Sequence, residues 1–368
     1  MNILPLLSRR SIAVSSLLSF LSLGVSESHA CTSLLLETAD GGHVYGRTME
    51  FGYELESEGL FVPRGMANQG TGPAKNPGKE WKSDYAVIGM AALNQDFVVD
   101  GINEKGLVGG ILYFPGFAEY TSPDEADASK AVAPWEFLTW ALGTCSSVEE
   151  IKAKIDEVQV IGLKVPGPNF IPPFHYTFHD AEGKSIVIEP TGGELKVFDN
   201  PFGVMTNSPT FDWHLTNMRN YVKLSPENVD SFTVKGTKVD SFGQGSGWLG
   251  IPGDPTPPSR FIRALAFSMT PEPEPSGIKS VRLAEHVMNN FDIPYGSIRP
   301  AGKPKKGEFD YTQWTAIVDI ENRLYYIKTY NNQMLQSISF DDFDLEGEVA
   351  VKAPIADDLS VSKLEFPN

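Results

Sequence analysis

Stretches of alternating apolar and polar residues occur in groups along this chain, and the groups are separated by helical patterns. Residues 31–36 and 43–49 alternate around the turn Asp40-Gly41-Gly42, which predicts a β-hairpin. Further strands are predicted at 85–90, 97–100, 107–114, 174–179, 185–189, 194–198, 204–206, 311–319, 323–329 and 334–340. Helices are predicted at 134–142, 147–158, 211–221, 259–268 and 280–291.

The Gly- and Pro-rich stretches 63–80, 160–173 and 224–258 are interpreted as loops. Because strands come in runs with helices between the runs, and not as βαβ units, the order predicts an α+β fold. Its sheets should be mainly antiparallel and covered by helices.

The first 30 residues have the pattern of a cleavable secretory signal. Arg9 and Arg10 supply positive charge, residues 12–25 supply a short apolar run, and Ser28-His29-Ala30 has the small-x-small form of a cleavage site. Cleavage after Ala30 leaves 338 of the 368 residues, 31–368, which we interpret as a single domain. Cys31 then becomes the first residue.

A cysteine at this position has three interpretations. It can be an N-terminal nucleophile, because its free α-amine, with a pKa of roughly 7.7–8, can act as general base to its own thiol. It can be a disulfide partner or a buried thiol; Cys145 is the other cysteine of the chain and is expected to be a buried packing thiol. It can also be the lipidated residue of an exported lipoprotein, although Ser28 stands where such sites usually have Leu.

Charge and hydropathy exclude some partners. Removing residues 1–30 takes the net charge from −17 to −18, which disfavours binding to nucleic acid or anionic membranes. No later apolar stretch is long enough to span a membrane. The histidines are scattered, with His175 and His179 expected on one strand face, so neither a metal nor a cofactor is expected. Residues 245–250 match G-x-G-x-x-G, but a Pro-rich segment follows in place of a helix.

Two charged residues on the returning strand of the first hairpin are candidates for chemistry. Arg47 is within reach of Cys31 and would stabilise its thiolate. Glu50 could bind the α-ammonium group by a charge-assisted hydrogen bond. Taken alone, the two residues are equally consistent with an ordinary surface ion pair.

At family level, the chain resembles the choloylglycine hydrolases, which include conjugated bile salt hydrolases and penicillin V acylases. The segments that carry the resemblance are Cys31-Thr32-Ser33, residues 46–51, 100–107, 175–178, 206–209, 242–245 and 258–261. The resemblance covers essentially all of 31–368. It implies a four-layer αββα sandwich of the N-terminal-nucleophile hydrolase type, with two mainly antiparallel sheets flanked by helices.

The resemblance also assigns roles by position. Cys31 matches the nucleophile and base, Arg47 the arginine beside the thiol, and Arg260 a second active-site arginine. Glu50 stands where most members have an Asp that binds the amine, and Asn207 matches the oxyanion donor. Tyr113 matches a pocket residue that is Tyr or Asn in members, and Tyr is commoner in penicillin V acylases. From the residues themselves, Phe51, Tyr53 and Phe114 are candidates for an apolar acyl pocket or for ordinary core packing.

The expected activity is therefore hydrolysis of a linear amide whose acyl group is apolar. Phenoxyacetyl amides of the penicillin V type are preferred as substrates, acyl homoserine lactones come second and conjugated bile salts third. We expect export to the periplasm, by a Sec or a twin-arginine route, and the resemblance suggests a homotetramer. The non-enzymatic alternative is a binding lipoprotein anchored through Cys31.

Overall fold

The structure is a computed structural model that describes residues 30–165, 170–302, 309–359 and 361–367. Two sheets dominate this part of the chain, and every strand pair within them is antiparallel. The five-stranded sheet has the order β1 (Cys31–Glu37), β2 (His43–Phe51), β16 (Tyr311–Asp319), β17 (Leu324–Thr329), β18 (Gln336–Ser339). The eight-stranded sheet has the order β13 (Glu194–Asp199), β12 (Ser185–Thr191), β11 (Phe174–His179), β8 (Val108–Tyr113), β7 (Val98–Asn103), β6 (Val87–Ala91), β3 (Glu58–Val62), β19 (Val351–Pro354).

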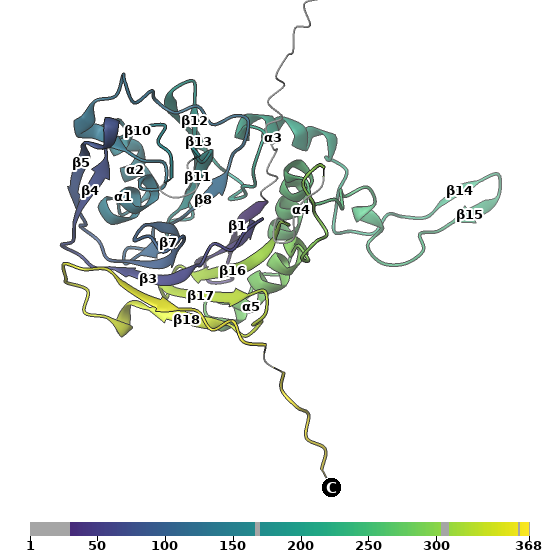
Figure 1. The fold of residues 1–368 in the computed structure, drawn as a ribbon. Helices are drawn as coiled ribbons and strands as arrows, with labels where there is room; N and C mark the ends of the chain where they lie inside the picture. Colours follow the sequence, from purple (N-terminus) through teal and green to yellow (C-terminus); the bar gives the residue numbers. More distant parts are fainter. Residues whose placement is uncertain (1–29, 166–169, 303–308, 360, 368) are drawn as a thin grey trace, which may run out of the picture.

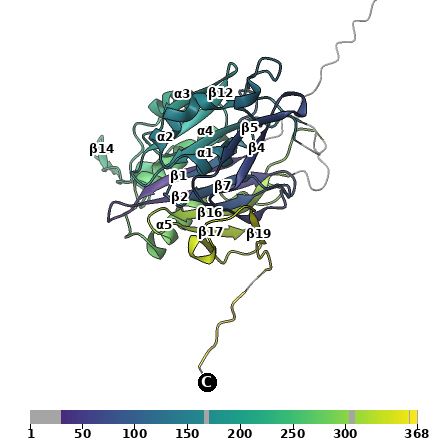
Figure 2. The ribbon, with the colours of Figure 1, turned by 90° about the vertical axis from the view of Figure 1, so that its left-hand side faces the viewer.

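Helices cover the outer face of each sheet. Helix α1 (Phe137–Thr144) packs on β7 and β8, and α2 (Val148–Lys154) follows it; α4 (Pro257–Met269) packs on β1, and α5 (Ile278–Met288) packs on β2 and β16. In Figure 2, α1 and α2 lie on the opposite side of the molecule from α5. The layer order is therefore helices, sheet, sheet, helices, which is the predicted αββα sandwich.

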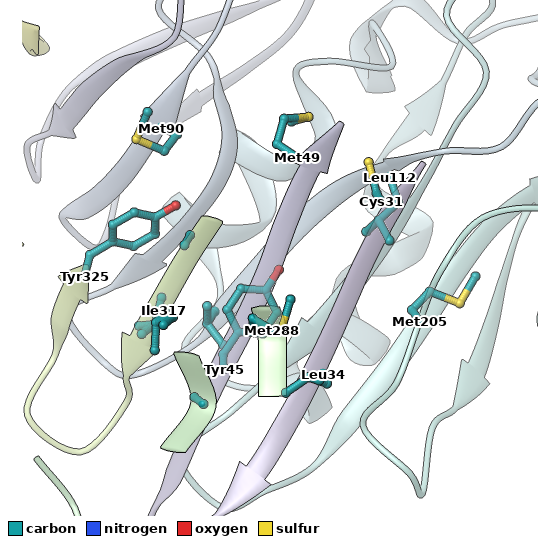
Figure 3. Packing of buried hydrophobic residues seen from close by; sticks show 14 of the residues in the cluster. Cys31, Leu34, Tyr45, Met49, Met90, Leu112, Met205, Met288, Ile317 and Tyr325 are labelled. Atoms are coloured by element: carbon teal, nitrogen blue, oxygen red, sulfur yellow. The ribbon is translucent and has the colours of Figure 1, made fainter. Parts of the chain in front are cut away.

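Apolar side chains from both sheets meet between the layers. One cluster joins Tyr45 and Tyr325 of the five-stranded sheet to Ile88 and Leu112 of the eight-stranded sheet, and Figure 3 shows Tyr45, Tyr325 and Leu112 in this region. A second cluster lies between the eight-stranded sheet and the helices and contains Cys145. Burial raises the pKa of the Cys145 thiol to about 11. The prediction of a buried packing thiol at this position is confirmed.

Most sequence predictions agree with these elements, and three segments differ. Residues 63–80 contain the hairpin of β4 (Ala67–Thr71) and β5 (Pro77–Lys82), where a loop was predicted. Residues 224–258 contain a second hairpin, β14 (Phe232–Val234) and β15 (Thr237–Val239), which projects from the body of the molecule in Figure 1. Residues 204–206 do not form a strand; Met205 makes an isolated bridge to Ser33. Part of the predicted loop 160–173 lies outside the described residues.

The remaining elements are short. β9 (Ala131–Val132) pairs with β10 (Gln159–Val160), and α3 (Phe211–Asn217) lies beside α4. Ser147 caps α2, because its side chain accepts a hydrogen bond from the backbone of Glu150. Within the described residues, no helix is long and apolar enough to span a membrane.

Three neighbouring strands approach closely because they carry glycine at adjacent positions. Gly101 of β7 pairs with Gly89 of β6 and with Gly109 of β8. A Cβ atom on Gly89 would lie 2.6 Å from the Cα of Gly101 and closer still to the carbonyl oxygen of Asp100. These neighbours are backbone atoms of a central strand, so they cannot move aside without disturbing the ladder.

We therefore expect Gly89→Ala to destabilise the protein by roughly 1–3 kcal/mol, the usual range for overpacking. The matched control is Gly253→Ala, because a Cβ atom at Gly253 meets no described atom within 4 Å. Urea unfolding of both variants and the parent measures the effect. Equal unfolding midpoints for the two variants would show that the strands can separate to admit a methyl group.

Candidate active site

Cys31 lies at the start of β1, which is the edge strand of the five-stranded sheet. Its register partner on β2 is Met49, and Figure 3 shows the two side by side. The open edge of β1 is covered by residue 205, which exchanges two backbone hydrogen bonds of 2.8 and 3.0 Å with Ser33. Both Ala30 and Cys31 are buried. Both cysteines of the chain are free thiols, so the disulfide interpretation of Cys31 is wrong in this structure.

Arg47 is fully buried, with its guanidinium group beside the thiol. Nη2 lies 3.6 Å from Sγ of Cys31 and donates to the carbonyl of Ile111 at 2.6 Å. Nη1 lies 3.3 Å from Oδ2 of Asp100 and 3.1 Å from the carbonyl oxygen of Val99. Burial acts to lower the pKa of Arg47, but the negative charges of Cys31 and Asp100 raise it above its ordinary value. Arg47 therefore stays cationic beside the thiol, and a cation in this position favours the thiolate form of a cysteine.

Asp100 holds Arg47 from the side opposite the thiol, a role that the sequence analysis missed. Its carboxylate accepts hydrogen bonds from the hydroxyls of Tyr45, at 2.7 Å, and Tyr325, at 2.8 Å. Burial raises the pKa of Asp100, whereas Arg47 and the two hydroxyls lower it. Its sequence segment contributes to the family resemblance, but nothing in the sequence pairs Asp100 with Arg47.

Asn207 connects the nitrogen of Cys31 to two other predicted site residues. Oδ1 accepts hydrogen bonds from the Cys31 backbone nitrogen at 2.8 Å and from Nη2 of Arg260 at 2.6 Å. Nδ2 donates to the carbonyl of Tyr113 at 2.7 Å. Because a carbonyl can only accept, this network fixes which end of the Asn207 amide faces Tyr113.

Arg260 is in the first turn of α4, and the packing of this helix on β1 brings its guanidinium group to Cys31. Nη1 donates to the Cys31 carbonyl and, at 2.8 Å, to Oγ1 of Thr32, while Nε donates to the Pro255 carbonyl at 2.8 Å. Burial lowers the pKa of Arg260 to about 10, with Glu50 and Cys31 acting in the opposite direction. The group is still cationic at neutral pH.

Glu50 is buried on β2, next to Met49. Oε1 accepts a hydrogen bond of 3.0 Å from Thr312, and Oε2 has no hydrogen-bond partner among the described residues. Burial raises the pKa of Glu50 to about 8, although the charge of Arg260 lowers it. The predicted bond from Glu50 to the Cys31 nitrogen is not formed. In the full-length chain this nitrogen belongs to the Ala30–Cys31 peptide bond and donates to Asn207.

A pocket opens at the thiol. Cys31 and Arg47 lie in its wall, and most of the other lining residues are apolar. The aromatic residues of the lining are Phe51, Tyr53, Phe97, Tyr113, Trp135, Phe170 and Phe174. An apolar, aromatic lining of this kind is typical of a pocket for a small organic ligand.

Four residues were named from the sequence as pocket candidates, and the lining of the cavity contains three of them. Phe51, Tyr53 and Tyr113 line it, and Phe51 meets Tyr53 edge-to-face at 4.5 Å. Phe114 is not in the lining; it stacks on His175 at 4.4 Å, so its core-packing interpretation holds. Phe97, Trp135 and Phe174 were missed because they come from separate segments that only the tertiary fold brings together.

Two sequence motifs that were not assigned to a metal or nucleotide site have the local structure expected for them. His175 and His179 are both on β11 and buried, as expected for one strand face. Residues 246–248 form a 3₁₀ turn within the G-x-G-x-x-G match, without the helix that a nucleotide site requires.

Comparison with known proteins identifies the family of this chain. Residues 31–353 match the family model for linear amide C–N hydrolases of the choloylglycine hydrolase family. A bile salt hydrolase/transferase of Clostridium perfringens is 37% identical over 86% of this chain and 94% of its own length. A penicillin V acylase of Pectobacterium atrosepticum is 25% identical over 84% of this chain and 80% of its own length.

A solved structure agrees with the sequence relatives. The crystal structure of a variant of the Clostridium perfringens conjugated bile acid hydrolase superposes with a TM-score of 0.80 at 33% identity, covering 91% of this chain and 100% of that one. The fold is therefore that of the N-terminal-nucleophile hydrolases. The chain belongs to the choloylglycine hydrolase family and is a linear amide hydrolase.

We expect Cys31→Ser in the processed protein to lose at least ~10³ in amide hydrolysis, because the hydroxyl is much less acidic than the thiol. Its melting temperature should stay close to that of the parent, since Cys31 makes no disulfide. Cys145→Ser is the matched control and should show the reverse pattern, because it places a hydroxyl in an apolar cluster far from the thiol chemistry. Retained hydrolysis in Cys31→Ser would assign the nucleophile to another residue.

Because the pKa of Glu50 is raised, we expect the stability of the chain that retains Ala30 to depend on pH. Its folded pKa of about 8 lies above the ordinary value of 4.5 for a glutamate, so between these values the folded state holds a proton that the unfolded state has lost. Stability from this group is full below pH 4.5 and is lost as the pH rises toward 8. Glu50→Gln should therefore be the more stable protein at pH 8, by roughly 2–4 kcal/mol, and equal to the parent near pH 4.

Urea unfolding of Glu50→Gln and the parent from pH 4 to pH 8 measures this difference. If the free energies of unfolding of the two proteins differed by the same amount at every pH, Glu50 would be ionised in the folded state.

Proposed function

We propose that the processed protein hydrolyses linear amides with an apolar acyl group, using Cys31 as an N-terminal nucleophile, and that phenoxyacetyl amides of the penicillin V type are its preferred substrates. One observation carries the proposal. The thiol of Cys31 lies in the wall of an aromatic cavity, with the buried cation of Arg47 3.6 Å away. A carbonyl placed at the mouth of this cavity would meet an activated nucleophile.

The chemistry follows from cleavage after Ala30. The freed α-amine takes the proton from Sγ, and the thiolate attacks the carbonyl carbon to form a tetrahedral oxyanion. Nδ2 of Asn207 carries two N–H groups and gives one to Tyr113, so the second can stabilise the oxyanion. The protonated amine product leaves, and water then hydrolyses the thioester.

Glu50 is proposed to bind the α-ammonium group in the processed enzyme. Its unpartnered Oε2 atom is a buried acceptor, and Glu50 follows Met49, the register partner of Cys31. A positive charge beside Oε2 would form an ion pair with the carboxylate and so offset the cost of removing that carboxylate from water. Arg260 is proposed to orient the start of β1 through its bonds to the Cys31 carbonyl and Thr32.

The cavity lining favours an aromatic acyl group. Phe51 meets both Tyr53 and Tyr113 edge-to-face, so a phenyl ring that enters can join an existing cluster of aromatic contacts. Conjugated bile salts are the second candidate, because the 37% identical relative is named a bile salt hydrolase/transferase. Acyl homoserine lactones, which also present an apolar acyl group on a small polar amine, are the third.

Export and assembly remain part of the same proposal. Residues 1–30 are proposed to direct the chain to the periplasm and to be removed there, and the mature protein is proposed to form homotetramers, as the family resemblance suggests. An N-terminal sequence that begins Cys-Thr-Ser would exclude the lipoprotein alternative, since an acylated cysteine blocks sequencing.

Kinetics on a substrate panel test the function. We expect the processed protein to hydrolyse penicillin V with a kcat/KM at least ~10-fold above that for penicillin G, glycodeoxycholate or a long-chain acyl homoserine lactone, which corresponds to about 1.4 kcal/mol. The matched control is the same chain with Ala30 retained, which keeps the cavity but lacks the free amine and should be inactive. Preference for glycodeoxycholate would reject the penicillin-type substrate, and inactivity on the whole panel would reject the proposal.

A further inference from the structure

Two buried histidines make hydrogen bonds to two consecutive backbone carbonyl groups, those of Thr206 and Asn207. Nε2 of His175, on β11, lies 3.1 Å from the carbonyl oxygen of Thr206. Nε2 of His214, on α3, lies 2.9 Å from the carbonyl oxygen of Asn207. Both rings are completely buried, and neither belongs to the residues that surround the thiol.

The protonation state of His214 follows from its surroundings. Burial lowers the pKa of its imidazole to about 4, so the ring is neutral at ordinary pH and carries one N–H group. A carbonyl oxygen can only accept, so that proton is on Nε2 and is donated to Asn207. The ring also stacks on Phe261 at 4.6 Å, and Phe261 follows Arg260 in α4.

A carboxylate lies beside the second histidine and caps the helix that carries the first. Nδ1 of His175 lies 3.5 Å from Oε1 of Glu189, on β12, without a hydrogen bond between them. The same oxygen accepts a 2.9 Å hydrogen bond from the backbone nitrogen of Phe211, the first residue of α3. Glu189 thus fixes the start of the helix that carries His214.

We propose that His214 is a positioning residue for the reaction: by donating to the carbonyl of Asn207, it fixes the backbone from which the Asn207 side chain reaches Cys31. The inference rests on the proposed function, in which Nδ2 of Asn207 stabilises the oxyanion. The Asn207 side chain has only two torsion angles, so a fixed backbone leaves its amide little freedom. A preset donor needs no reorganisation as charge develops, and such preorganisation is a main source of oxyanion stabilisation.

The test is a double-mutant cycle between His214 and Asn207. His214→Phe keeps a ring against Phe261 and removes the donor. We expect it to lower kcat by ~10–100-fold with KM within ~3-fold of the parent, because the lost interaction acts mainly in the transition state. In the Asn207→Ala background, the same substitution should lower kcat by less than ~3-fold, since the group it positions is already absent.

Two further variants separate positioning from general packing. His214→Gln places an amide donor near the position of Nε2 and should recover most of kcat. His179→Phe is the matched control, because His179 is equally buried but bonds the hydroxyls of Thr177 and Ser185. A phenyl ring also preserves its contact with Tyr45. We expect His179→Phe to keep the parental kcat, whatever its effect on the melting temperature.

Crystal structures of the variants provide a readout that needs no substrate. In His214→Phe, or in His214→Leu if the first variant does not fold, we expect the Asn207 side chain to leave the Cys31 nitrogen or the Tyr113 carbonyl. Unchanged Asn207 bonds, additive losses in the cycle, or an equal loss in His179→Phe would each overturn the positioning role. If the parent hydrolyses no amide, the proposed function fails, and the variant structures still decide whether His214 positions Asn207.

Discussion

The structure depends on one buried cation. Moving the guanidinium group of Arg47 out of water costs several kcal/mol unless it is paired and hydrogen-bonded. Its compensation comes from Asp100, from the carbonyls of Val99 and Ile111, and from the ring of Trp314, 5.1 Å from Cζ. These groups are on three strands of two different sheets. The charge beside the thiol is therefore compensated only when the two sheets are packed against each other.

Space for this arrangement comes from glycine. A Cβ atom on Gly110 of β8 would lie 2.6 Å from Oδ2 of Asp100 and 2.8 Å from the hydroxyl of Tyr45. Gly110 therefore leaves room for charged and phenolic groups between sheets that otherwise pack apolar side chains. The thiol and the cation beside it are thus built into the core of the fold, on strands β1 and β2.

The sequence predicted the layers well because their signals are local. Alternation and turn residues identify most strands of both sheets, and the first hairpin alone brings Arg47 near Cys31. The 63–80 hairpin was missed because its glycines were interpreted as turn residues. Gly70 and Gly78 in fact allow close approach to the carbonyl oxygen of Ala131. That approach is a tertiary contact, and no pattern within the segment reports it.

The site was only partly predictable for the same reason. Asn207 and Arg260 are 176 and 229 residues from Cys31, and only the family resemblance named them. Asp100 contacts the Arg47 side chain and His214 contacts the Asn207 backbone, and no sequence pattern reports either contact. The predicted contact of Glu50 with the Cys31 nitrogen is not formed in a chain where that nitrogen is still a peptide amide.

The burial of Ala30 has a consequence for the order of maturation. Ala30 is 3% exposed and Cys31 2%, so the bond between them is enclosed once the domain has closed around Asn207. A peptidase must accommodate several extended residues on both sides of the bond that it cuts. The proposed removal of the leader would therefore have to occur before or during folding. A chain that folded first would be trapped as an intact precursor, with the nitrogen of Cys31 locked in a peptide bond.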